Sequence, residues 1–203
     1  MNELAQTGRW FICCAQPRLV IKKAMAVSSN FRREQRGVAI RMVAALCVTI
    51  LVTVVWVYWS VPDSRPLPDR LVAVARADLL VLFWLAATIG NVARLRFFSV
   101  NDIAGSVSTT GSVNVSSANA VLQNTLEQAA LAVPIHVALA VLVVSSVPLI
   151  TALSMLFAIG RFLFWIGYAN GARSRAFGFA LTFYPSVAGL IIAVVAAVRL
   201  SLD

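Results

Sequence analysis

Long runs of apolar residues alternate along the chain with short polar segments. A helix needs about 20 mostly apolar residues to cross roughly 30 Å of hydrocarbon. Residues 38–60 and 176–198 reach this length without an acidic residue, and both are rich in Val, Leu, Ile and Ala. Residues 71–93 also qualify, because Arg76 and Asp78 lie near the start, where a long side chain can reach the headgroups. Each of these three segments predicts one membrane-spanning helix.

The segment between Glu127 and Arg161 contains no charge at all. As one helix it would be about 50 Å long, which is too long for a single crossing. The sequence Ser145-Ser146-Val147-Pro148 interrupts it, and Ser followed by Pro is a typical start of a new helix. We therefore expect a tight helical hairpin with arms 118–144 and 147–169. The complete pattern predicts an all-α integral membrane bundle with five spans.

Composition and charge agree with a membrane location. The 203 residues are 60% hydrophobic and only 12% charged, and their mean hydropathy is +0.86. Soluble domains average about 25% charged residues, so most soluble enzyme classes are excluded. A net charge of +9 would suggest nucleic acid in an ordinary soluble protein. In so apolar a chain it indicates a lipid bilayer as partner and no nucleic acid.

The basic residues predict the orientation, because Lys and Arg concentrate in short cytoplasmic loops. Residues 1–37 hold seven Lys and Arg against two Glu, and show no strong helical periodicity. Alternating spans place this basic segment on the same side as two Arg pairs, at 94 and 96 and at 173 and 175. We expect the N-terminus in the cytoplasm and the C-terminus on the opposite side. Residues 99–119, rich in Ser, Thr, Gly and Asn, are expected to form the longest internal loop.

Familiar catalytic motifs are absent from the sequence. It has no phosphate-binding glycine loop and no nucleophile elbow. Its cysteines, Cys13, Cys14 and Cys47, show no metal-ligand spacing and no disulfide framework. We expect no metal site, so any chemistry must come from the few polar residues inside the spans, which are candidates for function.

Two pairs of such polar residues face each other across the predicted hairpin. Asn124 and Glu127 are three residues apart, and Arg161 and Tyr168 are about two turns apart, so each pair shares a helix face. With the turn centred near Ser146, Asn124 lies level with Tyr168, and Glu127 lies one turn from Arg161. The spacing therefore predicts an Arg161–Glu127 ion pair in the cytoplasmic half.

Two further residues complete this picture. Arg175 lies just beyond the pair, at the mouth of the cluster. His136 is nine residues after Glu127 and falls on the opposite face of its helix, where we expect a packing or inter-subunit role. The simpler alternative is that the ion pair only joins helices.

The motifs at these positions resemble a known family. They are Asn124-Thr125-Leu126-Glu127-Gln128, followed by Pro134, and the stretch RFLFWIGYANGARSRAFGFALTFYP at residues 161–185. Arg161, Tyr168 and Arg175 are spaced by seven, as in the MAPEG proteins, the membrane-associated proteins in eicosanoid and glutathione metabolism. The chain resembles a bacterial-type member of that family over residues 71–199. Residues 38–60 would be an additional N-terminal helix.

The resemblance implies a four-helix membrane bundle that assembles as a homotrimer. It implies that glutathione, as co-substrate, lies between neighbouring subunits at the cytosolic side. Asn124, Glu127, Arg161 and Tyr168 would bind glutathione, with Arg94 as a further candidate, and Arg175 would stabilise its thiolate. The second substrate would be a lipophilic small molecule from the bilayer, either an electrophile or a lipid hydroperoxide.

Two departures from the family pattern leave an alternative open. Ala120 stands where Arg is often found, and Phe164 stands where Tyr is common. Each change removes a polar contact. The alternative is a non-catalytic membrane protein of the same fold, in which the polar cluster orders the bundle. A transporter or channel subunit would need more intramembrane charge than this sequence has.

Overall fold

The computed structural model describes residues 17–59, 65–100, 102–103 and 112–202, with backbone only in residues 17–30. Residues 1–16 of the expected cytoplasmic segment, residues 1–37, therefore lie outside the described residues. All elements in the described ranges are helices, in the order α1 (Pro17–Trp59), α2 (Leu67–Phe97), α3 (Val113–Leu142), α4 (Val147–Tyr168) and α5 (Ala172–Leu202).

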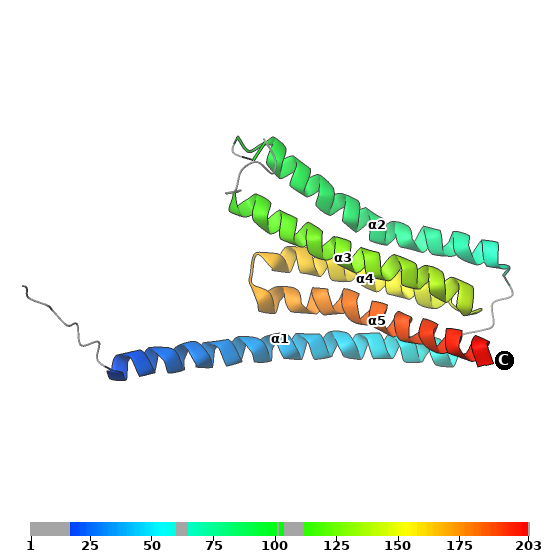
Figure 1. Cartoon of the computed structure of the whole chain (residues 1–203), viewed down its shortest axis with the longest axis horizontal. Coiled ribbons are helices and arrows are strands. Elements are labelled where there is room, and N and C mark those ends of the chain that lie inside the picture. The colour runs from blue at the N-terminus through cyan, green and yellow to red at the C-terminus, as the bar shows by residue number, and fades with distance from the viewer. Residues whose placement is uncertain (1–16, 60–64, 101, 104–111, 203) are drawn as a thin grey trace, which may run out of the picture.

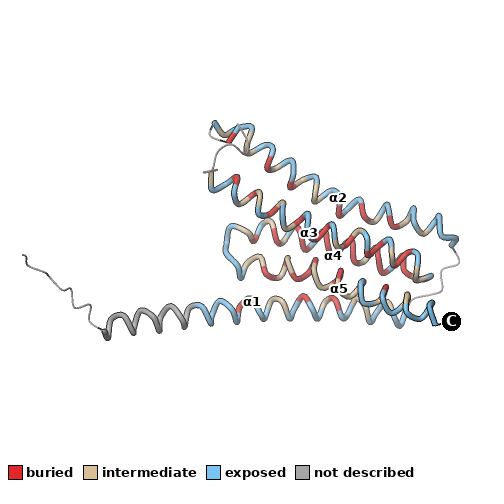
Figure 2. Tube along the Cα trace, viewed as in Figure 1, coloured by how far each residue is buried: buried red, intermediate tan, exposed pale blue. Residues whose placement is uncertain are grey.

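The five helices run alternately up and down in one bundle (Figure 1). Each contains a segment long and apolar enough to cross a membrane. The all-α, five-span architecture is confirmed, and the chain is a multi-pass integral membrane protein. Buried positions concentrate on α3 and α4, where 44% of the span is buried, against 11% in α1 (Figure 2). The bundle is therefore centred on the α3–α4 hairpin, and α1 lies at its edge.

Helix α1 is much longer than the expected span. It begins at Pro17, and its 43 residues extend for about 65 Å, well beyond the rest of the bundle (Figure 1). The helix thus extends beyond the expected span of residues 38–60 and includes residues 17–37 of the basic segment. Pro is well tolerated in a first turn, and neither Gly nor Pro follows before Gly37, so nothing interrupts the helix.

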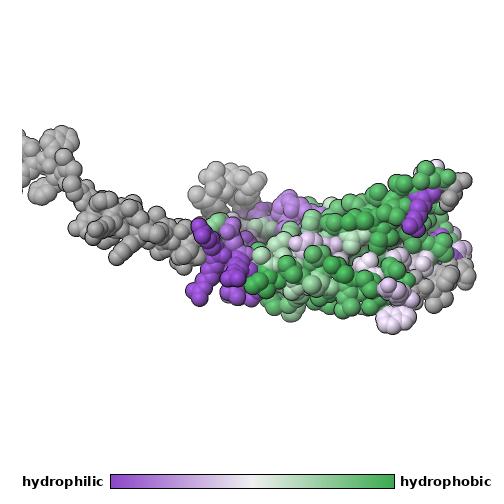
Figure 3. Space-filling model, turned by 90° about the horizontal axis from the view of Figure 1, so that it is seen from below, coloured by the Kyte–Doolittle hydropathy of each residue, from purple (hydrophilic) through white to green (hydrophobic). Residues whose placement is uncertain are grey.

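The surface of this helix changes character along its length. Exposed polar side chains at residues 32–36 form a hydrophilic patch beside a largely hydrophobic surface (Figure 3). Hydrocarbon accepts apolar side chains, whereas Arg and Glu require water or headgroups. The boundary between the two surfaces therefore marks one membrane–water interface.

The connection between α2 and α3 is shorter than the expected loop of residues 99–119, because α3 already begins at residue 113. The Ser112 side chain accepts a hydrogen bond from the Val115 backbone N–H and caps the helix. Asp102 accepts bonds from the Ser99 hydroxyl (2.5 Å) and the Ser112 N–H (3.0 Å). These bonds hold the pKa of Asp102 below its usual range. The carboxylate thus fixes the start of α3.

The turn between α3 and α4 is stabilised by the two preceding helices. Pro148 occupies the first turn of α4, as the sequence indicates. Trp56 of α1 donates its indole N–H to the Ser145 carbonyl (2.9 Å), and Arg70 of α2 donates to the Val143 carbonyl (3.3 Å). Carbonyls at a helix end lack partners within the helix, so these side chains satisfy groups that would otherwise be unpaired.

Helices α4 and α5 approach most closely at two glycines. A Cβ atom built on Gly178 would lie 2.6 Å from the Gly160 carbonyl oxygen and would also collide with the Phe164 backbone nitrogen. These are backbone atoms, which cannot move independently of the helix. The short loop of residues 169–171 makes α4 and α5 neighbours. The absence of side chains at the two glycines then sets the distance between the helices.

We predict that Gly178→Ala destabilises the bundle, because α5 must move away from α4. The expected loss is about 1–3 kcal/mol, the range typical of overpacking, and is measured as a lower thermal unfolding midpoint in detergent. Gly90→Ala is the matched control, because no atom lies within 4 Å of a Cβ at Gly90. Equal effects of the two substitutions would contradict the close-packing explanation.

Candidate functional site

The centre of the candidate site is the guanidinium of Arg161 on α4. Its side chain is 1% exposed, although Arg is among the residues least often buried. It donates one hydrogen bond to the Asn124 side-chain oxygen on α3 (2.8 Å) and another to the Thr182 hydroxyl on α5 (2.5 Å). One side chain therefore connects three helices.

Arg161 has no carboxylate partner among the described residues. Its charge lies near two aromatic rings, with Cζ 4.6 Å from the centroid of Phe164 and 5.7 Å from that of Phe157. Its Nε has no hydrogen-bond acceptor. A buried cation is usually paired, so neutral oxygens and ring faces provide its stabilisation here.

Arg161 also determines how Asn124 presents its amide. Because the side-chain oxygen of Asn124 accepts from the guanidinium, its NH₂ group remains available to donate elsewhere. Asn124 lines a cavity of about 360 Å³, whereas Arg161 is buried behind Asn124 and Phe164 and does not line it. Arg161 is thus a positioning residue for the cavity wall.

The cavity has one charged side chain in its wall. Arg175 lies over the ring of Tyr168, with its Cζ 4.5 Å from the ring centroid, and this stacking fixes the position of the guanidinium. Phe164 supports Tyr168 in turn, with the ring centroids 5.5 Å apart. A volume of about 360 Å³ is within the range of small-molecule sites. The lining residues are Val38, Met42, Ala120, Asn124, Phe164, Tyr168, Ala172, Arg175, Ala176 and Phe179.

Glu127 does not join this group. It is exposed and accepts a hydrogen bond from Gln123 on its own helix (3.0 Å), while Arg161 bonds to Asn124 and Thr182. The predicted Arg161–Glu127 ion pair is not formed. Three residues of helix rotate the side-chain direction by about 300°, so Glu127 diverges by about 60° from Asn124. That difference places Asn124 at the cavity and Glu127 on the outer surface.

Arg94 lies apart from the cavity. It is exposed at the end of α2 and donates to the Asn91 side chain (3.2 Å). It lines a separate cavity of about 200 Å³ beside Ser99 and Ser112 at the start of α3. The structure thus brings together Asn124, Arg161, Tyr168 and Arg175, and leaves Glu127 and Arg94 outside this group.

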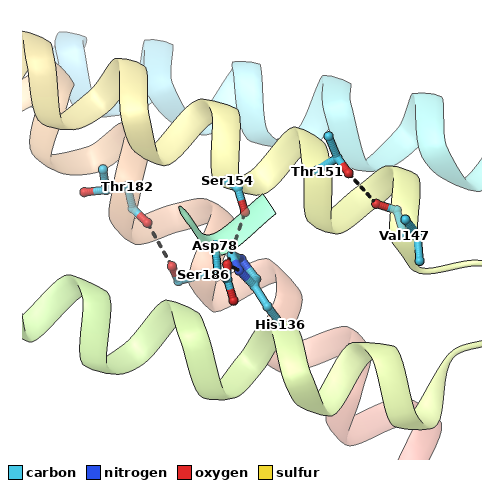
Figure 4. Close-up of polar contacts among 7 residues, drawn as sticks. All are labelled: Asp78, His136, Val147, Thr151, Ser154, Thr182 and Ser186. Atoms are coloured by element: carbon cyan, nitrogen blue, oxygen red, sulfur yellow. Dashed lines mark hydrogen bonds and ion pairs between the residues drawn. The ribbon is translucent and has the colours of Figure 1, made fainter. Parts of the chain in front are cut away.

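A second buried polar cluster lies farther along the bundle, and the sequence reasoning missed it. Asp78 was expected near the membrane surface, but it is 4% exposed and contacts His136 Nδ1 (2.5 Å) (Figure 4). The Ser154 hydroxyl donates to the same carboxylate oxygen (3.3 Å). His136 is an interior residue, on the face opposite Glu127 as expected. The sequence does contain a signal for this pair, because an acidic residue in one span and the lone His in another each need a polar partner inside the membrane.

This cluster joins α2, α3 and α4. Ser154 bonds to Asp78 and not to His136, so the arrangement differs from a nucleophilic triad. Ser186 on α5 donates to the Thr182 carbonyl (3.0 Å) (Figure 4), and the Thr182 hydroxyl accepts from Arg161. Within the described part of the chain, no group of three or more His, Cys, Asp or Glu could hold a metal ion.

Comparison with known protein families gives one match. The model of the MAPEG family matches residues 71–195, which contain most of α2, all of α3 and α4, and most of α5. Both residue clusters lie inside the matched region, and α1 lies outside it. No curated protein and no solved structure matches the chain.

Proposed function

The chain belongs to the MAPEG family, and from this premise we propose that it binds glutathione and conjugates it to a lipophilic electrophile, or uses it to reduce a lipid hydroperoxide. The observation that carries the proposal is the position of Arg175. It provides the one charge in the wall of a largely apolar cavity, among the ten residues that line it. An anion with an apolar reaction partner fits this combination.

The polar residues match the groups of glutathione, which has two carboxylates, one ammonium and one thiol. Arg175 and the Asn124 amide can donate to a carboxylate or to the sulfur, and the Tyr168 hydroxyl adds a third donor. Glu127 lies outside the cavity of its own chain and would accept the ammonium of glutathione bound to a neighbouring subunit. Arg161 supports binding indirectly, because its guanidinium donates to the Asn124 side-chain oxygen and thereby orients the Asn124 amide.

Arg175 has a clear task in the chemistry. A thiol with a pKa near 8.5 is only a few per cent thiolate at pH 7, so a nearby cation increases the reactive fraction. In conjugation to an aryl chloride, the sulfur forms a bond to the ring carbon, chloride leaves with the bonding pair, and the thiol proton passes to water. In the hydroperoxide reaction, two glutathione molecules give one alcohol, one water and glutathione disulfide.

We predict that Arg175→Ala reduces turnover more than binding. Loss of one charge-stabilising donor typically lowers kcat by about a hundredfold, whereas the other donors still hold glutathione. Kinetics with a hydrophobic aryl chloride and calorimetric glutathione titration of the detergent-solubilised protein provide the two measurements. Arg199→Ala, at the far end of α5, is the matched control, because Arg199 is exposed and distant in sequence from the cavity residues. Equal losses in the two variants would contradict this role.

A non-catalytic family member is the second candidate, and specific observations favour it. Arg161 already connects three helices without any ligand. Ala120 and Phe164, the two departures from the family pattern, both line the cavity and make its wall less polar. The same titration separates the candidates, because absence of glutathione binding to the wild-type protein would reject the conjugation proposal.

We also propose the homotrimer that the family resemblance implies. Glu127 and Gln123 are exposed on α3, inside a candidate span. An ionisable side chain facing lipid is costly, so a second copy of the chain is the expected cover. This placement would let Glu127 reach glutathione bound to a neighbouring subunit.

Mass measurement in detergent tests this assembly. We expect the mass of three chains for the wild type. We expect partial dissociation for Glu127→Lys, because this substitution replaces a negative charge by a positive one in the proposed contact between subunits. Ile159→Lys, on the exposed surface of α4, tests whether any charge on the outer surface has this effect. A stable wild-type monomer would overturn the proposed trimer.

The distribution of basic residues in the fold supports the expected orientation. The start of the α1 span, the end of α2 and the α4–α5 turn lie at one end of the bundle (Figure 1). They carry most of the exposed Arg residues, and Lys and Arg favour the cytoplasmic side. We propose that this end is cytoplasmic.

Reporter fusions at the C-terminus measure this orientation in bacterial cells. An alkaline phosphatase fusion should be active, and a green fluorescent protein fusion should be dark, because the C-terminus lies at the opposite end from the basic residues. The reverse pattern would refute the proposed orientation.

A further inference from the structure

Helix α1 lies outside the region that matches the family, yet it is built firmly into the bundle. Ala45 packs with Ala180 and Leu181 of α5 in a common buried cluster. At the cytoplasmic end, Arg41 donates to the Arg173 carbonyl (2.7 Å). The other end is fixed by the indole hydrogen bond to the α3–α4 turn described above. The membrane-spanning part of α1 is therefore held near Arg41, near Trp56 and in the middle.

Close contact at Gly37 brings the basic end of α1 against α5. Gly37 is buried, and a Cβ at this position would lie 2.7 Å from two side-chain atoms of Arg173. The absence of a side chain on Gly37 lets the Arg173 chain lie directly on the helix. Val38, the next residue, is thereby placed at the α4–α5 end of the bundle, where the Arg175 cavity lies.

Two α1 residues form part of the cavity wall. Val38 and Met42 both line it, and their spacing of four places them on one face of the helix, one turn apart. Met is flexible and adapts to apolar partners of different shapes. The polar contribution comes from α3, α4 and α5, through Asn124, Tyr168 and Arg175. Helix α1 contributes only apolar surface.

The depth of Val38 and Met42 in the membrane suits a reaction between a water-soluble and a lipid-soluble substrate. The hydrophilic patch of residues 32–36 ends two residues before Val38, and the charge-free part of α1 begins at Met42. The cavity therefore lies at the interface between headgroups and hydrocarbon. Glutathione can reach this level from water, and an apolar molecule can reach it from the bilayer.

We propose that α1 provides the binding surface for the lipophilic co-substrate, and that Val38 and Met42 determine which electrophiles the cavity accepts. The favoured class is an uncharged electrophile with an extended apolar chain, because the α1 wall offers no hydrogen-bonding side chain. This inference rests on the proposed conjugation of glutathione and adds a specificity role for a helix outside the family region.

Size variants of Met42 test the specificity role. The substrates are 1-chloro-2,4-dinitrobenzene, which is compact, and an enal with a long alkyl chain, to which the thiol adds without a leaving group. Met42→Trp should lower kcat/KM for the enal by about tenfold or more relative to the aryl chloride, a typical effect of pocket shape. Met42→Ala should shift the ratio in the opposite direction. The Kd for glutathione is measured for both variants, so that a change in the substrate ratio is separated from a change in glutathione binding.

Ile40 supplies the matched control on the same helix, because it lies two residues away and is 63% exposed. Ile40→Trp and Ile40→Ala should leave the substrate ratio unchanged. A ratio that does not respond to Met42, or that responds equally to Ile40, would overturn the specificity role. Thermal unfolding of each variant shows that the bundle is intact, and the Ala variants give the answer if a Trp variant does not fold.

Photolabelling without glutathione separates this inference from the proposed function. A long-chain alkyl diazirine should label the peptide that contains Met42 in a saturable manner, and Met42→Trp should abolish this while Ile40→Trp preserves it. If the wild type is labelled in this way but shows no conjugation, the proposed reaction fails and the lipophilic site remains. If conjugation occurs but Met42 affects neither labelling nor substrate ratio, the role of α1 is refuted.

Discussion

A cation inside a membrane bundle must obtain its hydrogen bonds from the protein, and Arg161 shows how far this requirement shapes the structure. Its guanidinium is shielded from water and lipid, so Asn124 on α3 and Thr182 on α5 must lie within hydrogen-bonding distance. This condition fixes the relative depth of three helices. It also sets the direction of the Asn124 amide, and thereby the polar part of the cavity wall.

The Asp78–His136–Ser154 cluster imposes a similar condition on the other half of the bundle. It links α2 to α3 and α4 through three buried side chains, and each of these side chains is satisfied only if its partner is in place. Apolar packing in lipid gives little preference for one helix register over another, because lipid tails solvate Leu and Val equally well. The two polar clusters therefore supply register, while the glycine contact between α4 and α5 supplies proximity.

The sequence predicted the features that depend on length and local chemistry. The five spans follow from the length of apolar runs, and the hairpin at Pro148 follows from a local start signal. Antiparallel geometry predicted that Asn124 is level with Tyr168, and both line the same cavity. It did not predict the hydrogen bond from Arg161 to Asn124. Whether Glu127 or Asn124 meets Arg161 depends on how α3 is rotated about its axis, because their side-chain directions differ by about 60°. Residue spacing does not determine that rotation, so the absence of the ion pair could not be predicted. The buried position of Asp78 could not be predicted without knowing that His136, 58 residues away, is its partner.

The contribution of α1 was beyond prediction for a related reason. Nothing in the sequence of residues 38–60 distinguishes a lipid-facing anchor from a packed helix, because both are uniformly apolar. The structure resolves this through small contacts: Gly37 allows close approach, and Arg41 donates to a carbonyl in the first turn of α5. Both lie where the basic segment gives way to apolar residues. Helix α1 lies at that level and lines the Arg175 cavity through Val38 and Met42. Topology and the proposed substrate choice are therefore linked through the same few residues of α1.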